Sequence, residues 1–368
     1  MNVKILNTAD LHLGLRFNNH PEARESLVQA RYETLEKLVG MANDKDSEIL
    51  AIAGDLFDKT SMKVSEIQRA VGAINRFEGN VVLVLPGNHD YITADSPLWD
   101  RFKKEAGENV LILDEKEPVD LSEFNLDAIV YPAPCHAKHS PENATGWVKD
   151  VDKVSGKIHI GIAHGSIKGE SPDFDERYFP MTKRELEESG LDIWLLGHTH
   201  TTFPDKPGSR DIVFNPGTPE PDGFDCGHEG RAFLHTIDEK KSIQTEILST
   251  GSYRFLRVER SLNHQSDLDK LLEEFQKEEY RKSVVKLTVS GRPDPELYDE
   301  WQEKRQQIRD SVLELKPDGT NLRRMVTEEQ IRKEFAEGSF PEQLLSSIPE
   351  QNEAELQMAY ELIREVKE

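Results

Sequence analysis

The chain has 368 residues, of which 36% are hydrophobic, and its 46 Lys and Arg are outnumbered by 69 Asp and Glu, giving a formal net charge of −23. The length fits one large domain with a smaller appendage, and the apolar content excludes a disordered chain. The charge argues against a protein that binds long duplex DNA tightly and unaided, because that affinity depends on neutralising phosphates.

No apolar run approaches the roughly 20 residues that cross a bilayer, so we expect no membrane association. The N-terminal residues lead directly into an apolar run, so we expect no cleavable leader. The two cysteines, Cys135 and Cys226, have no paired spacing that would predict a disulfide framework. We therefore expect a cytoplasmic protein.

Residues 1–250 alternate short apolar runs with helical patterns, which predicts an α/β layered domain. The expected helices are Glu22–Asn43, Val64–Phe77 and Leu98–Ala106. After Asp211 the connections shorten, which favours an antiparallel second sheet packed on the first. Its expected strands are Ile212–Phe214, Ala232–Ile237, Ser242–Leu248 and Phe255–Val258.

A boundary is expected near residue 250, and it divides the chain into domains 1–250, 251–315 and 316–368. The second is a small α+β capping domain with helix Ser266–Glu278, strand Val284–Ser290 and helix Asp294–Leu313. The third is a charged, helical C-terminal tail whose last helix carries one apolar stripe, formed by Leu356, Ala359, Tyr360, Ile363 and Val366. This stripe either packs on the body of the protein or binds a partner.

Five apolar runs in residues 1–250 each end in Asp, Asn or His. The ends of strands in α/β proteins are the usual place for such functional residues. One such ending is weak evidence, but five in one chain predict a metal centre. The candidate ligands that follow the five runs are Asp10 and His12, Asp55, Asn88, His164, and His198 with His200.

Carboxylate, amide and imidazole groups suit manganese, iron or zinc in a mixed nitrogen and oxygen site. Two such ions about 4 Å apart can hold both the attacking and the leaving oxygen of a displacement at phosphorus. Asp55 is the candidate shared ligand, because a carboxylate can bridge two cations with two oxygens. Asp10, His12 and His200 would complete the coordination of one ion. Asn88, His164 and His198 would complete that of the other.

His89 follows a candidate ligand directly, and adjacent side chains in an extended turn diverge. We therefore expect it to steady the phosphate and to protonate the leaving oxygen rather than to bind metal. A catalytic imidazole needs a partner on its other nitrogen, and Asp58 is the candidate. The alternative is that Asp58 caps a helix, because Thr60 and Ser61 follow it.

These motifs resemble those of the calcineurin-like metallophosphoesterase superfamily and, within it, of the SbcD/Mre-type DNA repair exonucleases. The similar segments are Thr8–Gly14, Gly54–Asp58, Gly87–Asp90, His164–Ser166, Leu196–His200 and Asn215–Thr218. The resemblance implies a four-layer α-β-β-α sandwich, here joined to a small α+β cap domain and a helical tail. It further implies two divalent metal ions, manganese most of all, cleavage of DNA, and a homodimer.

The tail segments Ser339–Leu345 and Leu356–Leu362 are similar to the ends of bacterial SbcD-like proteins of the YhaO group. Such nucleases work with an SMC-like (SbcC-type) ATPase, which would give the tail a partner and supply basic contacts to DNA. Archaeal and eukaryotic Mre-type enzymes carry His at the position of Asp58. Asp is the pattern of the bacterial branch and of many phosphatases.

The family contacts DNA through the loop after the first motif, so Arg16 and His20 are candidate substrate contacts. Tyr91, beside His89, is placed to stack on a base or sugar. The alternatives are an ordinary loop residue for His20 and simple packing for Tyr91.

The expected function is DNA cleavage of the double-strand-break repair type. The alternative is a phosphoesterase acting on a small nucleotide or cyclic nucleotide, because the same metal ligands serve both. The residues of the motifs Asp10–Gly14 and Gly54–Asp58 and the additional residues after Gly251 favour the nuclease, whereas the negative charge favours the small substrate. A subunit without catalytic activity would lack a ligand or His89, and neither is missing.

Overall fold

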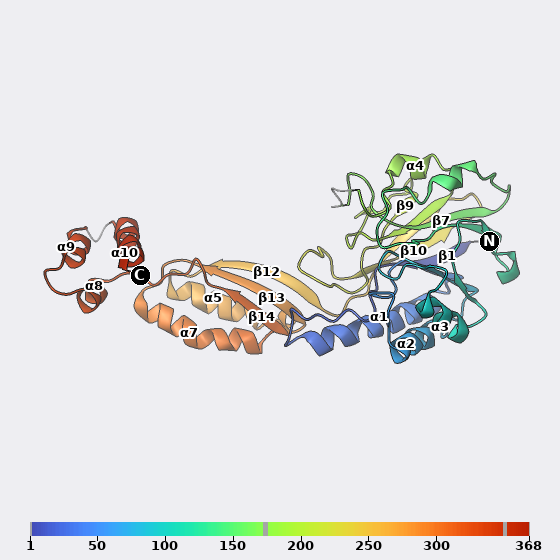
Figure 1. Cartoon of the computed structure of the whole chain (residues 1–368). Helices are drawn as coiled ribbons and strands as arrows, with labels where there is room; N and C mark the ends of the chain where they lie inside the picture. The colour runs from blue at the N-terminus through green and yellow to red at the C-terminus, as the bar shows by residue number, and fades with distance from the viewer. Residues whose placement is uncertain (1, 172–175, 349–351, 368) are drawn as a thin grey trace. The chain divides into compact units, whose positions relative to one another are not determined.

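The computed structural model describes residues 2–171, 176–348 and 352–367. The chain forms two compact units, Met1–Phe255 and Leu256–Glu368, and each has its own core (Figure 1). The division lies close to the boundary expected near residue 250. Within the described residues, no helix is both long enough and apolar enough to span a membrane.

The first sheet of the larger unit has six strands in the order β11-β10-β1-β2-β3-β4. Strands β1 to β4 run parallel, whereas β10 is antiparallel to β1, and β11 is antiparallel to β10. The register places Asn7 opposite Ala51 and Ala51 opposite Leu83, so β1, β2 and β3 end at the same edge. The strands are β1 Val3–Thr8, β2 Ile49–Ala53, β3 Val81–Leu85, β4 Val110–Ile112, β10 Arg231–Ile237 and β11 Ile243–Ser249.

The second sheet has five strands in the order β5-β6-β7-β8-β9. Strands β6 to β9 run parallel, and β5 is an antiparallel edge strand. His164 lies opposite Gly197, so β7 and β8 also end together. The strands are β5 Val119–Asp120, β6 Ala128–Ala133, β7 Ile158–His164, β8 Ile193–Gly197 and β9 Val213–Phe214.

The two sheets pack face to face, and helices cover their outer faces (Figure 1). Alternate residues of a strand point to opposite faces. Ala51 and Ile160 therefore belong to the core between the sheets, whereas Leu50 packs with Leu38 under the helices. Helices α1 (Arg24–Asp44), α2 (Val64–Ile74) and α3 (Pro97–Glu105) cover the first sheet, and α4 (Lys183–Glu187) and the 3-10 helix η2 (Gly146–Asp150) cover the second.

This arrangement confirms the four-layer α-β-β-α fold and the three expected helices of the larger unit, whose ends shift by a few residues. The expectation that the strands after Asp211 form a second, antiparallel sheet is wrong. β9 extends the second sheet in parallel, while β10 and β11 extend the first. The physical reason is the free edge of β1, because the parallel strands lie on its other side and an unpaired edge favours another strand.

The smaller unit contains a three-stranded sheet in the order β12-β13-β14, packed on helices. β14 (Glu314–Asp318) is parallel to β13 (Ser283–Ser290), with Leu315 opposite Val285. The expected domain boundary between residues 315 and 316 thus falls inside a paired strand. The other elements are β12 Arg254–Ser261, α5 Gln265–Phe275, α6 Glu278–Arg281 and α7 Pro295–Asp310.

The C-terminal helices are α8 (Glu328–Glu334), α9 (Phe340–Ser347) and α10 (Glu353–Lys367). They share a small core of their own, in which Tyr360 of α10 packs with residues of α8 and α9. The apolar stripe of α10 is therefore used in part within the tail itself. Val366, at the end of the stripe, is 89% exposed.

Candidate metal centre

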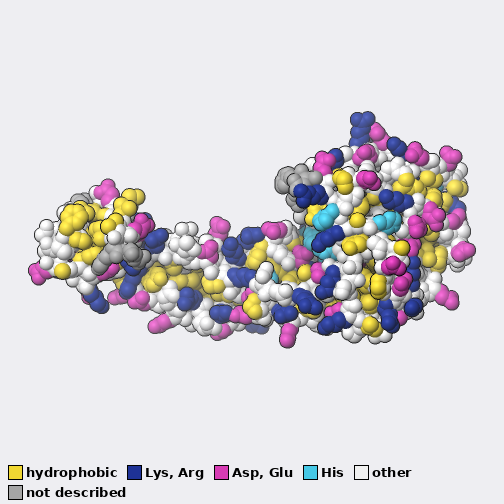
Figure 2. Space-filling view, viewed as in Figure 1, with side chains coloured by type: hydrophobic (Ala, Val, Ile, Leu, Met, Phe, Trp, Pro, Cys, Tyr) yellow, Lys and Arg dark blue, Asp and Glu magenta, His cyan; other side chains and the backbone are white. Residues whose placement is uncertain are grey.

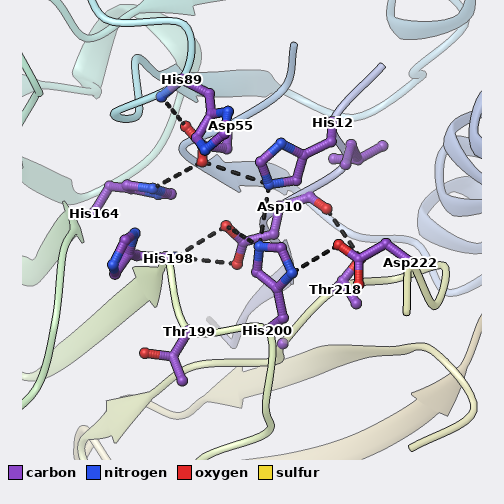
Figure 3. A network of polar contacts seen from close by, with 12 residues as sticks. Asp10, His12, Asp55, His89, His164, His198, Thr199, His200, Thr218 and Asp222 are labelled. Carbon is purple, nitrogen blue, oxygen red and sulfur yellow. Dashed lines mark hydrogen bonds and ion pairs between the residues drawn. The ribbon is translucent and has the colours of Figure 1, made fainter. Parts of the chain in front are cut away.

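All the candidate metal ligands lie at or just after the carboxyl ends of strands of the two sheets. Figure 3 shows the side chains of Asp10, His12, Asp55, His164, His198 and His200 converging, and Asn88 contacts two of them. The parallel pairing explains this, because neighbouring parallel strands have their carboxyl ends at the same edge of a sheet. The loops after β1 and β2 are hydrogen-bonded to each other: Asp10 N donates to Gly54 O (3.1 Å) and His12 N to Asp55 O (2.9 Å). Sequence segments far apart are thereby brought to one site.

Four candidate ligands have a positive φ: Asp10 (56°), His12 (44°), Asp55 (52°) and His198 (94°). Residues with a Cβ disfavour this left-handed region by about 1–3 kcal/mol each, and such strain gathers at functional sites. The surrounding backbone hydrogen bonds hold these residues in place despite the cost. The strain marks this edge of the fold as a functional one.

The first group of ligand atoms belongs to Asp10, His12 and His200. His12 Nε2 lies 3.1 Å from His200 Nε2, which in turn lies 3.9 Å from Asp10 Oδ1. Two ligands that bind one ion at right angles, each about 2.1 Å away, are about 3 Å apart. The spacing therefore fits a metal ion among the three side chains. Both carboxylate oxygens of Asp10 accept from His198 N, at 3.0 and 3.1 Å, which fixes the carboxylate.

The second group belongs to Asn88, His164 and His198. Asn88 Oδ1 lies 2.9 Å from His164 Nε2 and 2.9 Å from His198 Nδ1. The other nitrogen of His164, Nδ1, donates to the carbonyl of Ala53 (2.9 Å). A neutral His164 would thus direct a lone pair at the oxygen of Asn88, so a proton or a cation is needed at Nε2. This donor set fits a metal ion.

Asp55 lies between the two groups. Its Oδ2 lies 3.5 Å from His12 Nε2 and 3.3 Å from His164 Nε2, and its Oδ1 accepts from His89 N (2.8 Å). One carboxylate therefore reaches a nitrogen of each group. This is the geometry expected of a shared ligand.

Two glycines make room for these contacts. A Cβ at Gly54 would lie 2.1 Å from His164 Nδ1, and a Cβ at Gly87 would lie 2.2 Å from Asp55 Oδ1. Gly54 also has a φ of +94°, which favours glycine. The glycines of these motifs are thus required by the close approach of the ligands.

His89 lies beside the first group, with its ring 4.7 Å from that of His12. Its Nδ1 lies 3.0 Å from the main-chain carbonyl oxygen of Asp58, to which it donates. Asp58 is therefore the orienting partner of His89 through its backbone, not through the carboxylate that the sequence suggested. The Asp58 carboxylate lies 3.9 Å from His12 Nδ1 instead, and helix α2 is capped at Lys63, so Asp58 is not its cap.

The ionisable groups favour a cation in the cluster. Burial lowers the pKa of His164 and His200, but the nearby carboxylates outweigh it and raise both pKa values to about 9. Burial alone raises the pKa of Asp55, yet the surrounding imidazoles hold it below its ordinary value. Without metal, the imidazoles of His164 and His200 hold protons that balance the charge of the carboxylates. A divalent ion that binds must displace these protons.

Supporting residues also surround the ligands, and of these the sequence analysis gave no signal for Asp222 or Arg31. Asp222 Oδ2 lies 2.8 Å from His200 Nδ1, and Thr218 Oγ1 lies 3.0 Å from the carbonyl oxygen of Asp10. Arg31 is buried and donates to the carbonyl oxygen of Leu11 (2.6 Å). The motif Asn215–Thr218 lies just before Asp222, but it did not predict a role for Asp222 itself.

The candidate substrate contacts differ in their surroundings. Arg16 is exposed. His20 is only 9% exposed and packs against the ring of Phe255 (5.3 Å), which matches an ordinary packed loop residue. Tyr91 is half-buried against the core of the second sheet.

Comparison with known proteins adds a family to this geometry. The calcineurin-like phosphoesterase family matches residues 3–202. A curated relative, the uncharacterized metallophosphoesterase YhaO of Bacillus subtilis (strain 168), is 28% identical over 205 residues. This match covers 53% of the chain and 48% of the relative, so it spans about half of that protein's length.

Two solved structures are also similar. The chain aligns with TT1561 of Thermus thermophilus at 15% identity and a TM-score of 0.40, covering 67% of this chain and 99% of that one. It aligns with the calcineurin-like phosphoesterase YfkN from Bacillus subtilis at 13% identity and a TM-score of 0.36, covering 68% and 91%.

The matched residues 3–202 include every candidate ligand of the metal centre, from Asp10 to His200. They make up more than half of the chain, and the fold around them has the layers expected for the family. The chain therefore belongs to the calcineurin-like phosphoesterase family.

Proposed function

We propose that this chain is a two-metal-dependent DNA nuclease of the SbcD/Mre type, with manganese as its metal. The observation that carries the two-metal chemistry is the position of Asp55 between two groups of ligand atoms, with His89 beside them; the choice of DNA as substrate rests on the motifs. Each group supplies enough donors for one ion. A phosphodiester bound between them would meet both groups at once.

Each residue then has a distinct task. When bound, the two ions would align the attacking and leaving oxygens and offset the charge that develops at phosphorus. Because His89 Nδ1 donates to Asp58 O, Nε2 is the nitrogen left to face the substrate, and the imidazolium form of His89 would give its Nε2 proton to the departing sugar oxygen and become the neutral imidazole. The carboxylates of Asp10 and Asp55 are held in place by hydrogen bonds that they accept from the backbone nitrogens of His198 and His89.

DNA as substrate is supported by the similarity of the motifs to those of SbcD/Mre-type nucleases and by a cavity near the site. A cavity of about 520 Å³ is lined by residues that directly follow Asp58 and Asp90, among them Ser61 and Tyr91, and by Arg101. This volume is in the range of pockets that hold small molecules or single nucleotides. Tyr91 offers a ring for stacking and Arg101 a positive charge for a phosphate.

An SMC-like (SbcC-type) ATPase is the partner that we propose for the C-terminal helices. Figure 2 shows hydrophobic side chains gathered on the visible face of these helices. Phe340 is 73% exposed and Leu362 is 56% exposed, and both line an apolar groove of about 700 Å³. Such a surface is typical of a protein interface. We also propose a homodimer formed through α2 and α3.

The alternative is a phosphoesterase that acts on a small nucleotide or cyclic nucleotide. The net charge of −23 favours it, because a long polyanion is repelled more than a single phosphodiester. The metal ligands do not distinguish the two substrates.

The test is a gel assay with manganese on labelled single- and double-stranded DNA, with and without the co-expressed ATPase partner. Cleavage should disappear in Asp55→Asn and in His89→Ala. It should persist in His136→Ala, whose exposed imidazole contacts the carbonyl of Asp114. If the metal-loaded protein leaves all DNA intact yet hydrolyses bis(4-nitrophenyl) phosphate, the small-substrate alternative holds instead.

A further inference from the structure

The two ligand imidazoles His164 and His200 have different partners on their outer nitrogens. His164 Nδ1 donates to a neutral backbone carbonyl, that of Ala53 (2.9 Å). His200 Nδ1 instead lies 2.8 Å from the carboxylate oxygen Oδ2 of Asp222 (Figure 3). A carboxylate partner makes an imidazole a stronger metal ligand and fixes which nitrogen carries the proton.

Arg31 holds Asp222 against the metal site. Its side chain is 1% exposed, and one guanidinium nitrogen (Nη2) lies 3.6 Å from Asp222 Oδ2. The other (Nη1) donates to the carbonyl oxygen of Leu11 (2.6 Å), the residue between Asp10 and His12. One buried cation thus joins Asp222 to the backbone that carries two further ligands of the same group.

The segment that carries Asp222 is also braced. Thr218 Oγ1 lies 3.0 Å from Asp10 O and 2.7 Å from Glu220 O. The Glu220 carboxylate accepts from Thr34 Oγ1 (2.6 Å) and from the backbone nitrogen of Ser252 (2.8 Å). Residues 218, 220 and 222 are therefore each attached to a different part of the larger unit, so Asp222 cannot easily move away from His200.

We propose that Asp222 is a positioning residue for one of the two metal sites. It accepts the proton of His200 Nδ1, so Nε2 keeps its lone pair directed toward His12 and Asp10, and Arg31 balances its charge. The inference rests on the proposed ligand set of Asp10, His12 and His200. It predicts that the two metal sites respond differently to a change at residue 222.

The experiment is a calorimetric titration of the metal-free protein with Mn²⁺. In Asp222→Asn we expect one binding event to weaken about 10–100-fold, as for other outer partners of metal ligands, and the other to stay unchanged. Asp222→Glu, which keeps the charge, should recover part of the loss. Asp205→Asn is the matched control, because its exposed carboxylate pairs with Arg231 and touches no ligand.

Two further measurements separate positioning from damage to the fold. Circular dichroism of the metal-free variants should match the wild type. The visible absorption of Co²⁺-loaded protein should change in Asp222→Asn and not in Asp205→Asn, because only the former alters a ligand's orientation.

The outcomes distinguish this inference from the ligand set on which it rests. If the wild type does not bind two equivalents of Mn²⁺, the proposed ligand set fails. If the wild type binds two and Asp222→Asn behaves like Asp205→Asn, the role of Asp222 is refuted. Equal weakening of both events would also refute it, because the contact reaches only His200.

Discussion

In the candidate metal centre five of the seven candidate ligands (Asp10, His12, Asp55, Asn88 and His164) are buried, whereas in helices α8–α10 the candidate docking residues are apolar and exposed. His164 is fully buried and Asp55 is 1% exposed, while Phe340 of α9 is 73% exposed. Metal chemistry restricts both the residue type and its direction. A docking surface requires only apolar area of the right shape, so many sequences can provide it.

The largest effect expected from this contrast is at Asp55, which reaches a nitrogen of each ligand group. Asp55→Asn should lower Mn²⁺ affinity by at least about 100-fold, because even outer partners of ligands cost about 10–100-fold. Turnover of bis(4-nitrophenyl) phosphate should fall with the metal content. Plasma emission spectrometry after dialysis measures the metal, and retention of two ions in the variant would contradict the shared role.

His89→Ala should separate catalysis from metal binding. The imidazole Nδ1 donates to the carbonyl of Asp58, and both proposed ligand groups are complete without His89, so the metal content should stay near that of the wild type. The kcat should fall about 10²–10⁴-fold, the usual contribution of a proton donor. Loss of metal together with kcat would instead make His89 a ligand. His136→Ala, an exposed imidazole outside the site, is the matched control.

The sequence pointed to the candidate metal ligands but not to the residues that support them, because candidate ligands follow a repeated local pattern. His164 ends its apolar strand, and Asp10 and Asp55 each lie two residues after theirs; parallel strands have their carboxyl ends at the same edge of a sheet. Asp222 follows no strand and is far from His200 in the chain, so only the folded loop reveals their contact. The contact of His89 with a carbonyl rather than a carboxylate is likewise a matter of backbone geometry.

For the strands, too, the sequence predicted some features and missed others. β6 escaped the sequence analysis, because Pro132 interrupts its apolar run and proline is disfavoured in central strands. The expected partner of β10 was also wrong: β10 pairs with β1 instead of joining a separate antiparallel sheet, since a strand's own pattern does not say which free edge it will cover. Local periodicity thus predicts elements, whereas pairing depends on the whole fold.

Metal binding should depend on pH. The raised pKa values of His164 and His200, about 9 each, mean that both are protonated at pH 7 without metal. Binding must release these protons, so Mn²⁺ affinity should rise as pH increases from 6 to 9, by about tenfold per unit for each proton released. Calorimetry in buffers of different ionisation enthalpy counts the protons. A pH-independent affinity would show that the imidazoles are already neutral.

The same shifts act on the stability of the metal-free protein. A histidine whose pKa is raised in the folded state stabilises that state fully below its ordinary pKa of 6.5. This contribution is lost as pH rises through about 9. The metal-free protein should therefore melt at a lower temperature at pH 9 than at pH 6.5, and saturating Mn²⁺ should reduce the difference. An unchanged melting temperature between these two values would contradict the assigned shifts.

The smallest effect on the chemistry is expected from the apolar groove of the C-terminal helices. Leu362→Glu places a charge where a partner would bury apolar surface, so the co-expressed ATPase should no longer co-purify. Turnover of bis(4-nitrophenyl) phosphate should stay within about twofold, since exposed substitutions rarely cost more than about 0.5 kcal/mol. Val154→Glu is the matched control, at an apolar residue of the larger unit that is 49% exposed. If both variants keep the ATPase, the groove is not its docking surface; if Leu362→Glu alone loses it, the two regions divide catalysis and assembly between them.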